Sequence, residues 1–123
     1  MTDEPRVTLY SGELRPGTST YQGVYVSAES GDLVFEAQDV GELPRELFGD
    51  SDYEWWIRVA AADKPRVLAA LRAERPELAD EGENDAALLA AIEAVFGGRP
   101  DAVDAARHWL AEQSIDSEFS SWV

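Results

Sequence analysis

The chain has 123 residues, of which 45% are hydrophobic and 28% are charged, and it contains no cysteine. This composition is typical of one globular domain over residues 1–123 and argues against wholesale disorder. The absence of cysteine excludes disulfides, thiolate metal ligands and thiol nucleophiles, and it favours a reducing, cytoplasmic location. No run approaches the ~20 apolar residues of a membrane span, and the acidic start MTDEPRVTLY differs from a basic signal-peptide start, so we expect no membrane partner.

The charge is strongly unbalanced, with 25 acidic residues against 10 Lys and Arg and a formal net charge of −15. A field of this sign repels nucleic acid and anionic membranes, and it raises the rate of encounter with basic proteins. The same acidity also keeps small proteins apart in solution. Charge alone therefore leaves two readings open, a solubility device or a surface for a basic partner.

The first half of the chain predicts β-strands. Three runs rich in β-branched and aromatic residues indicate strands over residues 6–10, 21–30 and 31–40. Ser11 and Gly12 are expected to end the first strand, and the following RPGTST is typical of a turn. The sequence around Gly31 suits a tight hairpin, so the second and third strands should pair antiparallel.

The segment DYEWWIRV, residues 52–59, alternates in the manner of a strand with one core face. The predicted core side holds Tyr53, Trp55, Ile57 and Val59. The opposite side holds Asp52, Glu54, Trp56 and Arg58. The second tryptophan therefore shares its face with three charged residues. The segment before this strand, GELPRELFGDS, predicts a connection with at most one helical turn around residues 45–48.

The second half predicts three helices and a closing strand. Apolar residues recur at helical spacing after Asp63, after Asn84 or Asp85, and after Pro100, and Gly97 and Gly98 end the second helix. The final IDSEFSSWV reads as a strand that joins the sheet. The expected fold is α+β, a two-layer sandwich with a mainly antiparallel sheet of about five strands and three helices packed on one face.

Such a sandwich leaves one sheet face open, and this face is where a partner is expected. If residues 52–59 pair beside the terminal strand, alternation places acidic and aromatic side chains together there. Indole rings stack on guanidinium groups while carboxylates accept their hydrogen bonds. The predicted partner-binding residues are Asp52, Glu54, Trp56, Arg58, Glu118 and Trp122, with Ser120 between the last two. The alternative is that Trp122 turns inward and no such surface exists.

Catalytic and metal-binding patterns are sparse. His108 is the only histidine, and it shares a helical face with Asp104 and Glu112. One histidine with two carboxylates is a thin ligand set for zinc, and a solvated helix face is the preferred interpretation. The acidic run over residues 77–85 lacks the register of an EF-hand, and no phosphate-binding glycine motif occurs. We therefore predict no catalytic residue, no metal and no cofactor.

Three segments together carry a resemblance: SDYEWWIRVAAADKPRVLAAL, LLAAIEAVFGG and WLAEQSIDSEFSSWV. They resemble a group of small, acidic, single-domain bacterial proteins of unassigned function, which share an Asp-Tyr-Glu-aromatic strand and an acidic aromatic C-terminal tail. The resemblance covers about the C-terminal two-thirds of the chain. It supports the fold and implies no mechanism.

The function predicted from these features is that of a non-catalytic, acidic protein-binding domain. Its sharpest form is an immunity or inhibitor protein that neutralises a basic toxin or nuclease, because electrostatic steering speeds such capture. The alternative is a small-ligand-binding protein, or an enzyme that uses carboxylates only, with a pocket between sheet and helices. A stand-alone domain with a structural or stress role would have neither a partner nor a pocket.

Overall fold

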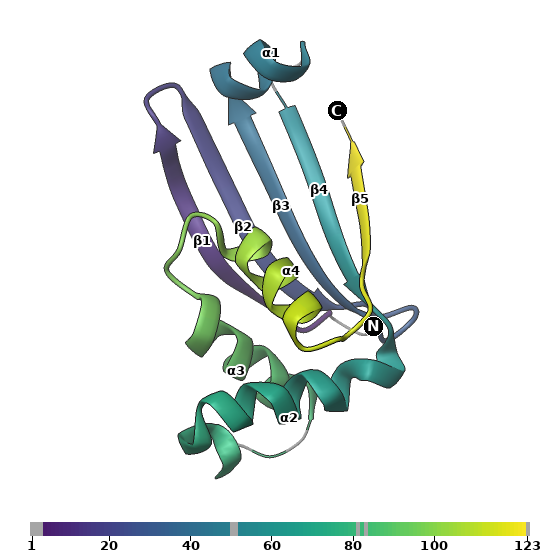
Figure 1. The fold of residues 1–123 in the computed structure, drawn as a ribbon. Coiled ribbons are helices and arrows are strands. Elements are labelled where there is room, and N and C mark those ends of the chain that lie inside the picture. Colours follow the sequence, from purple (N-terminus) through teal and green to yellow (C-terminus); the bar gives the residue numbers. More distant parts are fainter. Residues whose placement is uncertain (1–3, 50–51, 81, 83, 123) are drawn as a thin grey trace.

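The computed structural model of the protein describes residues 4–49, 52–80, 82 and 84–122. Its centre is a five-stranded antiparallel sheet whose strands lie side by side in chain order (Figure 1). The strands are β1 (Arg6–Arg15), β2 (Thr18–Val26), β3 (Leu33–Gly41), β4 (Asp52–Val59) and β5 (Glu118–Trp122). The predicted α+β class and the antiparallel five-stranded sheet are confirmed.

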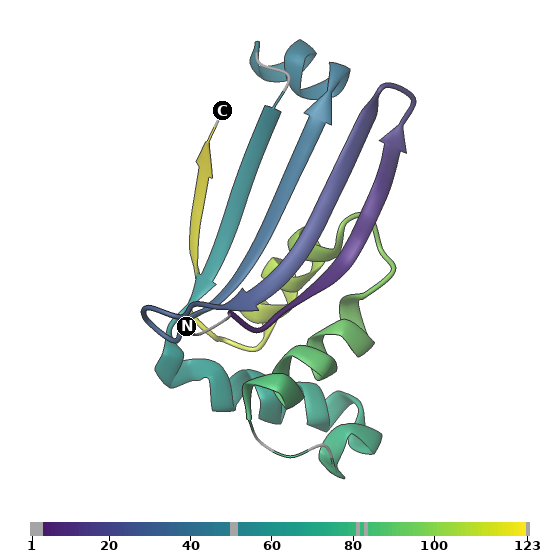
Figure 2. The same cartoon turned by 180° about the vertical axis from the view of Figure 1, so that it is seen from behind.

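In the described part of the chain, helices cover only one side of this sheet. The α-helices are α1 (Glu42–Phe48), α2 (Lys64–Glu74), α3 (Asp85–Phe96) and α4 (Ala102–Glu112), and short 3-10 turns occupy Ala61–Asp63 and Pro76–Asp80. Figures 1 and 2 show α2, α3 and α4 on the same side, α1 at one end of the strands, and no helix over the opposite face. None of the described helices is both long and apolar enough to span a lipid bilayer.

The expectation of three helices is wrong by one, because the described chain contains four α-helices. Gly41 is the N-cap of helix α1, and its φ of 134° turns the chain sharply at the end of β3. A Cβ at this position would collide with the Gly17 carbonyl oxygen, and that same oxygen accepts the Glu42 N–H at 3.1 Å. Pro44 falls in the first turn, where a missing N–H costs no helical hydrogen bond, and Gly49 ends the helix in the left-handed conformation. The extra helix therefore depends on a backbone contact with the preceding hairpin.

Strand β1 is longer than predicted, since it continues to Arg15 instead of ending at Tyr10. Ser11 and Gly12, which were expected to stop it, pair with Tyr21 and Thr20 of β2. Pairing satisfies their backbone groups, which local composition alone does not anticipate.

The core lies between the sheet and the helices. The largest fully buried apolar side chains come from β3, β4 and α2 to α4, and they include Leu33, Phe35, Ile57, Leu71, Ile92 and Leu110. Trp109 of α4 packs edge-on against Phe96, with ring centroids 5.9 Å apart, and its indole N–H donates to Glu74. The helical layer is thus tied together as well as packed on the sheet.

A buried chain of hydrogen bonds crosses this core from α4 to β3. The Val103 N–H, in the first turn of α4, donates to Gln22 Oε1 at 2.9 Å, and Gln22 Nε2 donates to Thr20 Oγ1 at 2.9 Å. The Thr20 hydroxyl in turn donates to the Asp39 carboxylate. Asp101, the N-cap of α4, makes no side-chain cap, so Gln22 caps the helix from a distant strand. Gln22 and Thr20 are almost completely buried, and this polar relay defines how α4 sits on the sheet.

Candidate protein-binding face

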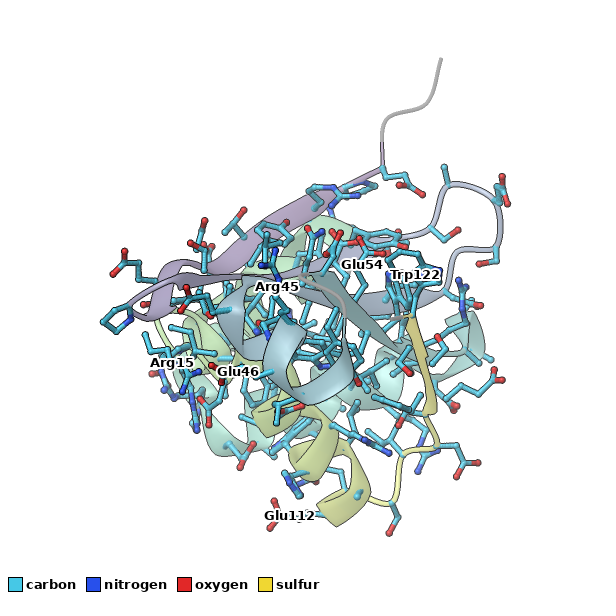
Figure 3. All side chains as sticks on the ribbon, turned by 90° about the horizontal axis from the view of Figure 1, so that it is seen from above. Arg15, Arg45, Glu46, Glu54, Glu112 and Trp122 are labelled. Carbon is cyan, nitrogen blue, oxygen red and sulfur yellow. The ribbon has the colours of Figure 1, made fainter. Side chains whose placement is uncertain are left out.

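Strand β5 pairs antiparallel with β4. The residues of these two strands that were expected on the uncovered side of the sheet therefore lie there together. The register joins Glu54 to Trp122, Trp56 to Ser120 and Arg58 to Glu118. Figure 3 shows Glu54 and Trp122 next to each other, with Glu112 of α4 on the other side of the sheet. The pairings of β2, β3 and β4 extend this surface, which we call the open face: Tyr21, Tyr25, Glu36, Gln38, Asp52, Glu54, Trp56, Arg58, Glu118, Ser120 and Trp122.

The two adjacent tryptophans of β4 lie on opposite sides of the sheet. Trp55 points into the core and is only 7% exposed, whereas Trp56 is half-buried on the open face. At the sheet edge, Trp122 is 54% exposed, so this indole does not turn inward. Two large aromatic side chains therefore present surface to solvent on the side that lacks helices.

Trp56 stands between two shallow hollows in the open face. One has a volume of about 160 Å³ and is lined on the β2 and β3 side by Tyr21 and Glu36. The other, of about 210 Å³, is lined by Tyr25, Arg58 and Glu118. Rigid aromatic walls with carboxylates beside them are suited to receiving single protruding side chains.

The open face already holds one guanidinium group of its own chain. Arg6 lies over the ring of Tyr25, 4.7 Å from the ring centroid, and its Nη1 donates to Glu36 Oε1. Stacking on an aromatic ring together with a carboxylate hydrogen bond is the arrangement that a basic partner would use. Tyr25 and Glu36 were missed in the sequence, although their alternation with buried residues along β2 and β3 was a usable signal.

Arg58 has an internal role. Its Nη1 donates to Asp32 Oδ2 at 2.9 Å, and Asp32 Oδ1 accepts the Ala61 N–H, also at 2.9 Å. The hydrogen bond from Arg58, followed by that from Ala61, lowers the pKa of the Asp32 carboxyl. This ion pair directs Arg58 toward the β2–β3 turn, at the edge of the open face.

Two carboxylates of the open face, Glu54 of β4 and Glu118 of the edge strand β5, differ from Asp32 in their ion pairing. Among the residues that the structure describes, none forms a salt bridge with Glu54 or Glu118. Asp52, at the far end of β4, accepts a hydrogen bond from Gln38 Nε2 at 2.8 Å. Glu54 and Glu118 thus leave two negative charges beside Trp56 and Trp122.

The helix face around His108 lies on the other side of the molecule. His108, Asp104 and Glu112 are all exposed on α4. Within the described part of the chain, no group of three or more His, Cys, Asp or Glu side chains is arranged to hold a metal ion. The structure therefore directs attention to the sheet.

No protein-family model matches this chain, and no curated protein or solved structure is significantly similar to it. The resemblance to small acidic bacterial proteins stays a prediction.

Proposed function

We propose that this protein is a non-catalytic binding protein that captures a basic protein on its open face. In its most specific form it is a cytoplasmic immunity or inhibitor protein that neutralises a basic toxin or nuclease. The observation that carries the proposal is the stacking of Arg6 on Tyr25 with Glu36 as its carboxylate partner. A partner's arginine would find the same chemistry next to Trp56, where Glu54 and Glu118 lie.

Charge supports the same proposal. A net charge of −15 on 123 residues creates a long-range field that attracts a basic protein and raises its association rate. Screening shortens this range to ~8 Å at physiological ionic strength. Association should therefore slow as salt is added, while the short-range stacking contacts govern how long the complex lasts.

The experiment compares the wild type with the double variant Glu54→Ala and Trp56→Ala. Each protein is immobilised and exposed to the native lysate at low and high salt, and captured proteins are identified by mass spectrometry. The binding of any partner is then measured with purified proteins. The double variant should stay folded and bind at least about 30-fold more weakly, as expected for a loss of ~2 kcal/mol at an interface anchor.

The matched control is Glu112→Ala, which removes one carboxylate from the far side of the sheet. It should bind within about twofold of the wild type, because it changes the net charge without changing the open face. Equal binding by the wild type and the double variant would refute the proposed surface. The immunity form has a further check: its gene should directly follow the gene of a basic toxin.

A further inference from the structure

A larger cavity, separate from the open face, lies on the helix-covered side. It is lined by residues of α1, α4 and the strands β3, β4 and β5, and its volume is about 360 Å³. Its apolar walls include Leu47, Tyr53 and Phe119, and its polar lining includes Asp39, Asp104 and Arg107. This volume falls within the range of small-molecule sites, which are mostly apolar with a few convergent polar groups.

Two buried polar atoms of residues that line this cleft have no hydrogen-bond partner in the described structure. They are the indole Nε1 of Trp55 and Oδ1 of Asp39. Trp55 is more than nine-tenths buried. Leaving a buried donor or acceptor unpaired costs about 1–3 kcal/mol for each group, and folded proteins rarely keep such groups without a purpose. One unpaired donor and one unpaired acceptor therefore belong to two residues that line the same cleft.

Asp39 is held in place by the buried relay described above. Thr20 donates to its carboxylate, Gln22 donates to Thr20, and the first turn of α4 donates to Gln22. One carboxylate oxygen is thus fixed from the core while the other remains unpaired. A preorganised carboxylate of this kind loses little conformational freedom when it binds a ligand.

The negative charge of Asp104 on α4 favours a positive charge near Asp39. Burial raises the pKa of the Asp39 carboxyl, and the charge of Asp104 raises it further. Tyr53 and Trp55 stack with ring centroids 5.1 Å apart, which adds aromatic faces beside the carboxylates. The guanidinium carbon of Arg107 lies 4.3 Å from the centroid of the Phe119 ring. An aromatic ring that lines this cleft therefore already contacts a cation of the same chain.

We propose that this cleft binds a small organic cation in which an ammonium or amidinium group stands next to a hydrogen-bond acceptor. The cation pairs with Asp39, and the acceptor receives the indole N–H of Trp55. An apolar body on the ligand packs between Leu47, Tyr53 and Phe119. The site is independent of the open face, because it opens on the opposite side of the sheet.

The test uses three related probes and a ¹⁵N-labelled protein. Phenylalaninamide carries an ammonium group, an adjacent carbonyl acceptor and an apolar ring. N-acetylphenylalaninamide lacks the charge, and phenethylamine lacks the acceptor. The readout is the set of indole N–H signals from the four tryptophans, with the Trp55 signal assigned from its absence in Trp55→Phe.

Phenylalaninamide should produce a saturable downfield shift of the Trp55 indole signal at millimolar concentration, because its carbonyl accepts that N–H. The acetylated probe should bind about tenfold more weakly or not at all, since the charge-assisted contact is lost. Phenethylamine should bind without the downfield shift. Asp39→Asn, which preserves shape and acceptance from Thr20, should weaken phenylalaninamide about tenfold, and Glu112→Gln should leave its affinity unchanged.

Any of three results would overturn the proposal. The first is the absence of any saturable shift with phenylalaninamide up to about 10 mM. The second is equal binding of the charged and acetylated probes, and the third is equal binding by the wild type and a folded Asp39→Asn. The double variant Glu54→Ala and Trp56→Ala should keep the full response, so failure of this site is distinguishable from failure of the open face.

Discussion

Replacing Gln22 with leucine tests the buried relay that joins α4 to the sheet. The change keeps side-chain volume while it removes both hydrogen bonds of the amide, to the Val103 N–H and to Thr20 Oγ1. Leaving these two buried groups unpaired costs about 1–3 kcal/mol each. Burial of the additional apolar surface of leucine returns about 1–2 kcal/mol. The net loss in the free energy of unfolding should be about 1–4 kcal/mol.

Thermal unfolding followed by circular dichroism gives the measurement. An unfolding entropy of about 2.1 cal/mol/K per residue over 123 residues corresponds to ~0.26 kcal/mol/K, so each kcal/mol lowers Tm by about 4 °C. Gln22→Leu should therefore melt about 4–15 °C below the wild type. The control Gln113→Leu makes the same substitution at an exposed position beyond α4 and should change stability by less than about 0.5 kcal/mol. If the two variants melted within about 2 °C of each other, the relay would have no structural role.

Three further substitutions test other parts of the fold. Asp39→Asn should gain stability relative to the wild type as the pH rises from about 4. Burial raises the folded-state pKa of the Asp39 carboxyl, so the stability of the wild type falls through that pH window. Urea melts at several pH values measure the difference in stability between the two proteins, which would be the same at every pH if burial did not raise this pKa. Gly41→Ala should cost about 3 kcal/mol or more in the free energy of unfolding, measured by chemical denaturation, because its Cβ would collide with the Gly17 carbonyl oxygen. The control Gly49→Ala, which has open space around it, should cost only about 1 kcal/mol. Equal losses in the two variants would contradict the contact between Gly41 and Gly17. The Asp32 carboxyl has a lowered folded-state pKa, so it contributes stability above about pH 4 that is lost as the pH falls through that pKa. Asp32→Asn should lack this contribution. If acid titration lowered the stability of the two proteins by the same amount at every pH, the ion pair of Asp32 with Arg58 would have no such role.

The parts of the fold that were predictable from the sequence are those governed by local periodicity. The alternation in β4 correctly placed Trp55 in the core and Trp56 on the other side. The start of α3 was also readable, because Asn84 accepts the Ala87 N–H at 2.8 Å as an N-cap should. Such signals depend on residues close together in the sequence, so they can be interpreted without knowledge of the tertiary structure.

The features that were missed depend on contacts between distant segments. Helix α1 requires Gly41 and Gly17 to meet, and capping of α4 requires Gln22 to reach across the core. In the candidate site, the residues of β4 and β5 were found because period-two alternation holds along both strands. Alternation along β2 indicates the side on which Tyr25 lies, but its stacking with Arg6 depends on the register of β1 and β2.

The chain-order arrangement of the sheet has a consequence for how the molecule folds. Strands β1 to β4 are neighbours both in sequence and in space, so each can zip onto the previous one with a short loop to close. Strand β5 is different, since its pairs with β4 join residues 60 to 68 positions apart, from Arg58 with Glu118 to Glu54 with Trp122. Closing so long a loop is entropically costly until the intervening helices have collapsed. The last strand should therefore dock late, which makes the tryptophan-bearing edge the final part of the protein to be assembled.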